Sequence, residues 1–255
     1  MPYAENHGVR IHYRVAGEGP PLVLQHGFTQ SIEDWDDCSY VAGLQADYRL
    51  ILVDSRGHGA SDKPHDPSAY TLDKRAGDIV AVLDAIRIAR AHFWGYSMGG
   101  WIGFGMAKFV PMRVDRLVIG GQIPYARSME GTRRMVRIGI EQGGDAFVAA
   151  SEERFGYKAS PKDRVRMLAA DLDAYLAAAQ DRDSLEDILP TMQMPCCFYV
   201  GEADPIYAEA KTASQLIPGA RFFSLPGLSH AGAFERSDLV LSQVIPFLRG
   251  AVDRH

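Results

Sequence analysis

The sequence predicts an α/β fold with a mostly parallel central sheet, and two patterns carry this prediction. Short, continuous apolar runs recur along the chain, and such runs are typical of strands that are covered on both faces. Between them lie segments whose apolar residues are spaced three and four apart, which places those side chains on one face of a helix. Strands that alternate with helices form a mostly parallel sheet.

The strands are expected in two groups. The first two flank a turn at His7-Gly8, and the second of them alternates apolar and polar residues, as a half-exposed strand does. The other strands are continuous apolar runs. The expected strands are Ala4–Asn6, Val9–Val15, Leu22–Leu24, Leu50–Val53, Phe93–Trp94, Leu117–Ile119, Cys196–Val200 and Phe222–Leu225.

One region interrupts the alternation of strands and helices. From Gln122 to Pro190 no strand pattern appears, and helical stretches rich in Arg, Met and Ala follow one another. The sequence therefore predicts a core made of residues 1–121 and 191–255, with a helical insertion at 122–190. A last helix contains Pro246, which is expected to kink it. The expected helices within the insertion are Thr132–Glu141, Asp145–Phe155, Asp163–Leu168 and Asp171–Ala179.

Composition limits the classes of function. The chain of 255 residues suits one α/β domain, and its net charge of −5 argues against a nucleic-acid surface. No segment approaches the roughly 20 consecutive apolar residues that span a bilayer. The N-terminal residues lack the basic and apolar regions of a signal peptide. Three cysteines, two of them adjacent, do not form a disulfide framework. We therefore expect a cytoplasmic protein with no membrane or nucleic-acid partner.

The segment Gly95-Tyr96-Ser97-Met98-Gly99 has the pattern G-x-S-x-G, between a predicted strand and an apolar helical stretch. In this context the serine sits on a sharp turn with its hydroxyl exposed. Glycine at both flanking positions allows the close approach that such a turn needs. The following helix directs its first N–H groups at the site, where they stabilise negative charge. Ser97 is therefore the expected nucleophile.

A serine nucleophile needs a base and an orienting acid. His230 lies in the loop after the last predicted strand and is the expected base. Asp204 follows the strand Cys196–Val200, at the carboxyl end where parallel sheets carry their sites, and is the expected acid. Glu202 is a neighbouring competitor for that role. The order serine, acid, histidine matches a known arrangement of such triads.

The oxyanion hole is expected at His26-Gly27-Phe28, directly after the first buried strand. We assign its two donors to the backbone N–H groups of Phe28 and Met98. His26 is expected to brace this loop through hydrogen bonds rather than to act as a second base. The segment Asp54–Ser61 lacks a phosphate-binding glycine motif and is interpreted as a turn-rich loop. No cluster has metal-ligand spacing, so no cofactor is expected.

Together these motifs resemble the α/β-hydrolase superfamily. They are H-G-F-T, D-x-R-G-H-G-x-S, G-Y-S-M-G, G-E-x-D and a late S-H, and they cover nearly the whole chain. The closest resemblance is to small bacterial serine esterases, enol-lactonases and cofactor-free haloperoxidases. This resemblance implies that residues 122–190 form a cap over the active site. Haloalkane dehalogenases and epoxide hydrolases share the fold but use an aspartate nucleophile, and Ser97 occupies that position here.

The sequence therefore predicts a serine hydrolase that cleaves a small or medium carboxylic ester or lactone through an acyl-enzyme intermediate. Alternatives are perhydrolysis, amide or carbon–carbon bond hydrolysis, and a hydrolase-fold receptor for a small ligand. The sequence does not identify the acyl and alcohol groups of the substrate or the physiological role. It also leaves the oligomeric state open, with a homo-oligomer as one alternative. The expected substrate-binding residues are Trp35, Tyr96, Trp101, Tyr125 and Met129.

Overall fold

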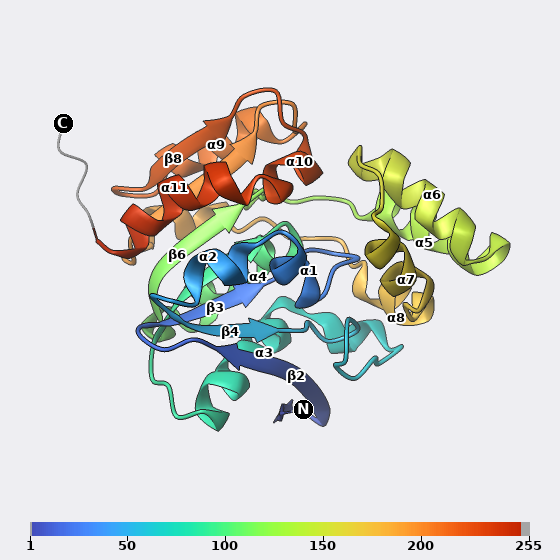
Figure 1. The fold of residues 1–255 in the computed structure, drawn as a ribbon, viewed down its shortest axis with the longest axis horizontal. Helices are drawn as coiled ribbons and strands as arrows, with labels where there is room; N and C mark the ends of the chain where they lie inside the picture. Colours follow the sequence, from blue (N-terminus) through green and yellow to red (C-terminus); the bar gives the residue numbers. More distant parts are fainter. Residues whose placement is uncertain (1, 251–255) are drawn as a thin grey trace.

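The computed structural model describes residues 2–250 and contains an eight-stranded sheet (Figure 1). The strand order is β1-β2-β4-β3-β5-β6-β7-β8. The two N-terminal strands pair antiparallel, and β2 pairs antiparallel with β4. Every pairing from β4 to β8 is parallel. The strands are β1 Tyr3–Asn6, β2 Val9–Ala16, β3 Pro21–Gln25, β4 Arg49–Val53, β5 Ala91–Tyr96, β6 Val114–Gly120, β7 Cys196–Gly201 and β8 Arg221–Leu225.

Helices cover both faces of the sheet. The α-helices of the core are α1 Glu33–Asp37, α2 Tyr40–Leu44, α3 Leu72–Ala85, α4 Met98–Phe109, α9 Tyr207–Gln215, α10 His230–Glu235 and α11 Ser237–Leu248. Two short 3-10 helices, η1 Pro67–Tyr70 and η2 Pro111–Arg113, precede α3 and β6. Buried side chains of α3, α4 and α9 pack in one apolar cluster, and those of α1, α2, α10 and α11 in another.

Successive strand residues alternate between these two clusters. In β4, Ile51 and Val53 belong to the first cluster, whereas Leu50 and Leu52 belong to the second. In the same way, Cys196 and Cys197 enter opposite clusters, as the two-residue period of a strand requires. The continuous apolar runs in the sequence are explained by this burial on both faces.

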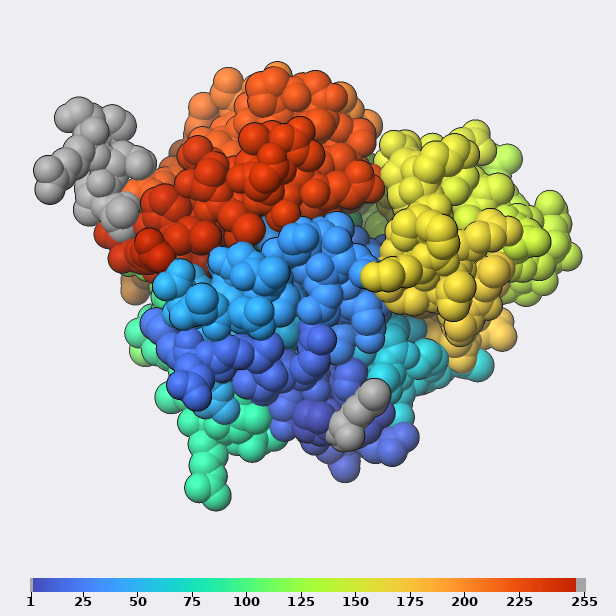
Figure 2. Space-filling model, viewed as in Figure 1, coloured from blue at the N-terminus to red at the C-terminus, as the bar shows by residue number. Residues whose placement is uncertain are grey.

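A helical insertion separates β6 from β7. Its helices are α5 Glu130–Gln142, α6 Gly144–Phe155, α7 Pro161–Leu168, α8 Leu172–Ala178 and the 3-10 helix η3 Glu186–Thr191. In Figure 1 the insertion, in yellow-green to gold, lies beyond the ends toward which the arrows of β3 and β4 point. Figure 2 shows it as a lobe set against the blue and red parts of the core.

Ion pairs connect the insertion to the core. Asp37 at the end of α1 accepts from Lys162 at 2.7 Å and from Arg166 at 2.8 Å, and both cations belong to α7. Asp34 lies 3.6 Å from Arg166 and is more deeply buried. These contacts fix α7 beside α1.

The expected strands and the helices of the insertion are all present, with bounds shifted by a few residues. The short helices α1, α2 and α10 and the helix α9 were not expected from the sequence, and His230 is the first residue of α10 rather than part of a loop. The last helix, α11, continues through Pro246. Within residues 2–250, no helix combines the length and the apolar composition that crossing a bilayer requires.

Candidate active site

Ser97 lies at a sharp turn between β5 and α4. Its backbone angles are φ 52° and ψ −112°, a conformation that an L-residue adopts only when its surroundings enforce it. The Ser97 N–H donates to the carbonyl oxygen of Gly120 at 2.8 Å, and the Ser97 carbonyl accepts from the Trp101 N–H at 3.1 Å. The turn therefore holds the hydroxyl-bearing residue between a strand end and a helix start.

The two flanking glycines are required by close backbone contacts. A methyl carbon placed on Gly95 would overlap the carbonyl group of Gly99, and one placed on Gly99 would overlap the carbonyl oxygen of Gln25. Neither glycine has a positive φ, so space rather than backbone conformation selects glycine here. The turn thus brings β5, α4 and the end of β3 together.

Ser97, His230 and Asp204 form a chain of hydrogen bonds. The distance from Nε2 of His230 to Oγ of Ser97 is 3.0 Å, and that from Nδ1 of His230 to Oδ2 of Asp204 is 2.6 Å. Asp204 is 4% exposed and also accepts from the Ile206 N–H at 3.2 Å. Three segments that are far apart in the sequence therefore meet at the carboxyl edge of the sheet, where parallel sheets carry their sites.

Glu202 lies apart from this chain. Its side chain is exposed and accepts a hydrogen bond from the hydroxyl of Ser224 at 2.7 Å. Tyr96 contacts His230 from another side, because its hydroxyl donates to the His230 carbonyl oxygen and its ring lies 5.4 Å from the imidazole. Burial raises the pKa of Tyr96 well above its usual value, so the phenol stays protonated and remains a donor.

The loop after β3 lies directly beside Ser97. A methyl carbon on Gly27 would lie 3.3 Å from Cβ of Ser97. The N–H of Phe28 donates to no acceptor within residues 2–250. The N–H of Met98 is the first of α4 and has no acceptor inside the helix. These two residues flank the serine and carry unused donors.

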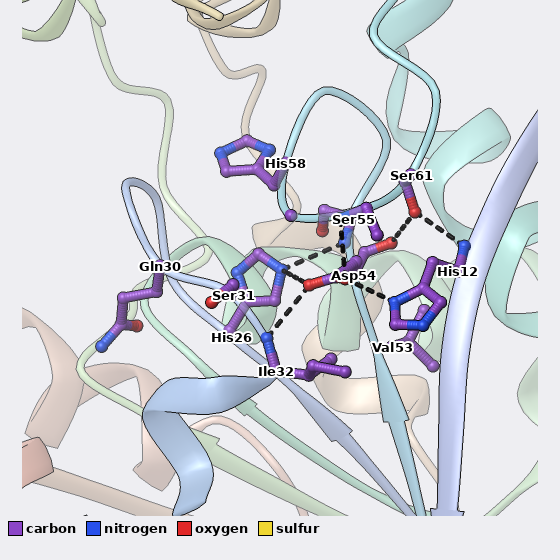
Figure 3. Close-up of polar contacts among 12 residues, drawn as sticks. His12, His26, Gln30, Ser31, Ile32, Val53, Asp54, Ser55, His58 and Ser61 are labelled. Atoms are coloured by element: carbon purple, nitrogen blue, oxygen red, sulfur yellow. Dashed lines mark hydrogen bonds and ion pairs between the residues drawn. The ribbon is translucent and has the colours of Figure 1, made fainter. Parts of the chain in front are cut away.

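His26 holds this loop from behind (Figure 3). The Ser55 N–H donates to Nε2 of His26 at 3.0 Å, so Nδ1 carries the hydrogen and donates to the Gly27 carbonyl oxygen at 2.8 Å. The ring is fully buried, and burial lowers its pKa, which keeps it neutral at pH 7. Both ring nitrogens are occupied by backbone groups, so His26 braces the loop.

Asp54 is the centre of the polar network behind the loop (Figure 3). One carboxylate oxygen accepts from the Ile32 N–H at 3.0 Å, and the other lies 2.7 Å from Nδ1 of His12 and accepts from the Ala60 N–H at 3.0 Å. The Asp54 carbonyl oxygen accepts from the hydroxyl of Ser61 at 2.7 Å. The segment Asp54–Ser61 is therefore a structural turn that supports the site.

A cavity of about 460 Å³ opens at Ser97. The core contributes residues that flank the serine, and the insertion contributes the opposite wall. Its lining includes Gly27, Phe28, Gln30, Tyr96, His230 and Phe234 from the core, and Phe155, Tyr157, Arg166 and Met167 from the insertion. The ring of Phe155 lies 6.2 Å from that of His230, with an angle of 26° between the planes.

Of the five residues expected to bind substrate, only Tyr96 borders this cavity within the described chain. Trp35 is fully buried and packs against Tyr40, Trp94 and Phe234 in the second apolar cluster. Its position on a helix that the sequence did not predict explains the difference.

The other three residues lie elsewhere at the junction of the insertion and the core. Trp101 and Met129 border a separate cavity, described below. Tyr125 packs against the first apolar cluster and a smaller one around Ile206. Trp101 lies on α4, and Tyr125 and Met129 lie in the first residues of the insertion. Both segments run away from Ser97.

Several residues at the site were not identified from the sequence. Gln122 donates from its side-chain amide to the Ser97 carbonyl oxygen at 2.8 Å. Phe155 and Tyr157 flank Gly156, the left-handed residue that ends α6. The pattern aromatic–glycine–aromatic at a helix end was the available signal for these two. Within residues 2–250, no group of His, Cys, Asp and Glu side chains could hold a metal ion.

The chain belongs to the alpha/beta hydrolase fold family, whose sequence profile matches residues 20–157. It is 28% identical over 214 residues to 3-oxoadipate enol-lactonase 2 of Acinetobacter baylyi, an alignment that covers 78% of this chain and 77% of that protein. The crystal structure of the enol-lactonase from Burkholderia xenovorans LB400 superimposes with a TM-score of 0.85 and 29% sequence identity, over 97% of this chain and 100% of that one.

A third relative matches over a shorter part. A Bacillus subtilis protein with the provisional name 2-succinyl-6-hydroxy-2,4-cyclohexadiene-1-carboxylate synthase is 31% identical over 150 residues. That alignment covers 54% of this chain and 54% of the relative, so the chain spans about half of the relative's length. The similarity to these proteins therefore defines the fold and the family, and their substrates differ from one another.

Proposed function

We propose that this protein is a serine hydrolase that cleaves a small or medium carboxylic ester or lactone. The observation that carries the proposal is the hydrogen-bonded chain from Oγ of Ser97 through His230 to Asp204, with distances of 3.0 Å and 2.6 Å. This is the arrangement of nucleophile, base and orienting acid that acyl transfer needs. Relatives named enol-lactonase support the substrate class.

In the proposed reaction, Oγ of Ser97 attacks the substrate carbonyl carbon while Nε2 of His230 accepts the hydroxyl proton. The carbonyl oxygen becomes an oxyanion and accepts hydrogen bonds from the N–H groups of Phe28 and Met98. The tetrahedral intermediate expels the alcohol, which takes the proton from His230. A water molecule then gives a proton to His230 and attacks the acyl-enzyme, which releases the acid and frees Ser97. Removing one oxyanion donor typically costs about 3 kcal/mol of barrier.

Asp204 acts through His230. Its carboxylate accepts from Nδ1–H of His230, which fixes the tautomer that leaves Nε2 free to accept the serine proton. The same carboxylate stabilises the imidazolium cation that forms during attack. Its burial and its second hydrogen bond from the Ile206 N–H keep the side chain in one orientation.

We further propose that residues 122–190 act as a cap that selects the substrate. Support comes from the cavity wall, where Phe155, Tyr157 and Met167 of the insertion face the same space as Ser97. These side chains present an apolar surface to the acyl or alcohol group of the substrate. A cavity of about 460 Å³ lies within the range that small-molecule sites occupy.

The proposed nucleophile is tested with a fluorophosphonate probe that labels activated serines. Intact-mass measurement should show one adduct on the parent protein and none on Ser97→Ala, while circular dichroism shows the same fold. Ser242→Ala, an exposed serine on α11, is the matched control and should be labelled like the parent. An adduct on Ser97→Ala that matches the parent would remove Ser97 from this role.

A further inference from the structure

A second cavity of about 450 Å³ lies where the insertion meets the core. It shares Phe28 with the cavity at Ser97, and Met98, the residue after Ser97, forms part of its wall. Ser97 and His230 are not among the residues that border it. Apart from the backbone N–H groups of Phe28 and Met98, the proposed reaction uses no group that borders this space. Two arginines, Arg75 of α3 and Arg182 of the insertion, line it.

Arg182 has unused hydrogen-bond donors. Its guanidinium lies over the indole ring of Trp101, 5.2 Å from the centroid. Within residues 2–250 this side chain makes no hydrogen bond and no ion pair, although its backbone pairs with Arg127. Guanidinium carries five N–H donors in a rigid planar fork. These donors border the cavity and no protein acceptor engages them.

Arg75 also makes no hydrogen bond to a carboxylate in the described part of the chain. It is 5% exposed, and it donates to the carbonyl oxygens of Tyr70 and Ala178, each at 3.1 Å. A third guanidinium nitrogen lies 3.3 Å from the sulfur of Met98. Its hydrogen-bond partners are therefore neutral groups, and the nearby carboxylate of Asp78 is hydrogen-bonded to Arg56 instead.

Another buried arginine shows how this fold ordinarily treats such a charge. Arg56 is 1% exposed and makes two hydrogen bonds to the carboxylate of Asp78, at 2.7 Å and 2.5 Å. A buried charge is costly unless it is paired. Burial, together with the nearby charges of Arg75 and Arg127, lowers the pKa of Arg182 to about 9. An anion in the cavity would offset this cost.

The carboxylates at the cavity are on its exposed rim or already engaged. Asp181 accepts from the Met129 N–H at 2.7 Å and from Arg133 at 2.9 Å. Asp183 and Asp73 are exposed to solvent. None of the three makes an ion pair with Arg75 or Arg182 among the residues described. These rim charges also disfavour a ligand with several negative charges.

We propose that this cavity is a binding site for a small organic monocarboxylate with an apolar body, held by Arg182 and Arg75. A planar carboxylate matches the fork of a guanidinium and accepts two parallel hydrogen bonds from it. The apolar body fits against Trp101, Phe28 and Met129, which line the same space. The site is separate from the proposed nucleophile, and carboxylate binding here does not require that Ser97 be active.

Isothermal titration calorimetry on Ser97→Ala tests binding in the absence of turnover. Phenylacetate should bind, and phenylacetamide, its neutral isostere, should bind at least about tenfold more weakly, since a charged hydrogen bond contributes roughly 1.5–3 kcal/mol. Adding Arg182→Gln should weaken phenylacetate binding by about tenfold or more. Adding Arg127→Gln, which removes an exposed charge beside the cavity, should change it less than about threefold.

Several outcomes of the titrations would overturn the proposal. They are equal binding of phenylacetate and phenylacetamide, equal weakening by Arg182→Gln and Arg127→Gln, and binding of inorganic phosphate in place of phenylacetate. If Arg182→Gln fails to fold, Arg182→Lys keeps the charge but loses the fork, and it should still weaken binding several-fold. Trp101 fluorescence should change on binding, because Trp35 and Trp94 are fully buried away from the cavity. An unchanged emission on saturation would also contradict the site.

Discussion

The side-chain amide of Gln122 donates a hydrogen bond to the backbone carbonyl oxygen of Ser97, over a distance of 2.8 Å. The amide oxygen of the same side chain accepts from the Ile123 N–H at 2.9 Å. Gln122 is 5% exposed and follows the end of β6. It therefore fixes the strained turn from the side of the neighbouring strand, and it does so without bordering the cavity.

Gln122→Leu should lower kcat by about five- to tenfold and leave KM nearly unchanged, because one buried hydrogen bond contributes roughly 1 kcal/mol. The loss acts through the orientation of Ser97, so Gln122 is a positioning residue. Steady-state kinetics on one activated ester measure both constants. A rise in KM with unchanged kcat would contradict this role, and equal thermal unfolding of parent and variant would exclude simple destabilisation.

Asp204→Asn should reduce kcat by about ten thousand-fold, the size of effect known for the equivalent change in a serine protease. The amide would favour the wrong tautomer of His230 and would no longer stabilise its cation. Glu202→Gln is the matched control and should cost less than about threefold, because Glu202 is exposed and bonds Ser224. The assignment of the acid fails if the two variants exchange these effects.

Phe155→Ala should change the preference among esters of increasing acyl length, because this ring borders the cavity at Ser97. Removing it enlarges the space, so longer acyl chains should gain relative to acetate. Met129→Ala is the control from the same insertion, since Met129 borders the other cavity. The measurement is kcat/KM over a series of p-nitrophenyl esters, and the same shift with Met129→Ala would place the selecting wall elsewhere.

Gly99→Ala should lower the free energy of unfolding by about 3 kcal/mol, because the added methyl group meets the Gln25 carbonyl oxygen in a packed interior. Gly219→Ala separates this effect from backbone strain. Gly219 has a φ of 68° with open space around it, so its substitution should cost only about 1 kcal/mol. Urea unfolding of both variants gives the comparison, and similar losses would argue against the steric explanation.

Stability should depend on pH through Asp34. Burial raises the pKa of Asp34 from 3.8 to about 6, so the folded protein binds this proton more tightly than the unfolded chain does. The free energy of unfolding should therefore fall as pH rises from about 4 to about 6, through this group alone. Asp34→Asn should remove that component of the slope, and an unchanged slope would contradict the assignment.

Asp37 should make the free energy of unfolding depend on pH in the opposite direction. Hydrogen bonds from Lys162 lower the pKa of Asp37, burial opposes this, and Arg166 lowers it further. Its contribution is present above its unfolded pKa near 4 and is lost as pH falls below that value. Asp37→Asn should therefore lower the free energy of unfolding at pH 7. The difference between the free energies of unfolding at acidic and neutral pH should then be smaller than in the parent.

The strands were predictable because they are buried on both faces, so that each appears as an uninterrupted apolar run. The positions of Ser97, Asp204 and His230 were predictable for a related reason. Each follows the end of a strand, and the topology of a parallel sheet brings those ends to one edge. Local sequence was therefore sufficient for the strands and for the expectation that these three residues lie together.

The cavity wall could not be predicted in this way. Trp35 and Trp101 are aromatic and close in sequence to site motifs, but the packing of α1 and α4 directs them into the core or toward the second cavity. Phe155 borders the cavity at Ser97 only because of how α6 ends and the insertion folds back. Such placements depend on tertiary packing between segments, which periodicity within one segment does not record.

The insertion leaves the sheet after β6 and returns at β7, and these two strands are direct parallel neighbours. The two ends of the insertion meet above the sheet, because Arg127 and Arg182 exchange backbone hydrogen bonds at 2.9 Å and the Leu185 N–H donates to the Pro124 carbonyl oxygen at 2.7 Å. These paired segments form a narrow stem. The part of the insertion beyond this stem can therefore be lengthened or replaced without moving Ser97, Asp204 or His230. Doubling a connecting segment costs only about 0.6 kcal/mol in closure entropy. Chimeras that carry a foreign insertion between 128 and 181 retain Gln122 and the paired stem, so the reacting groups should keep their positions.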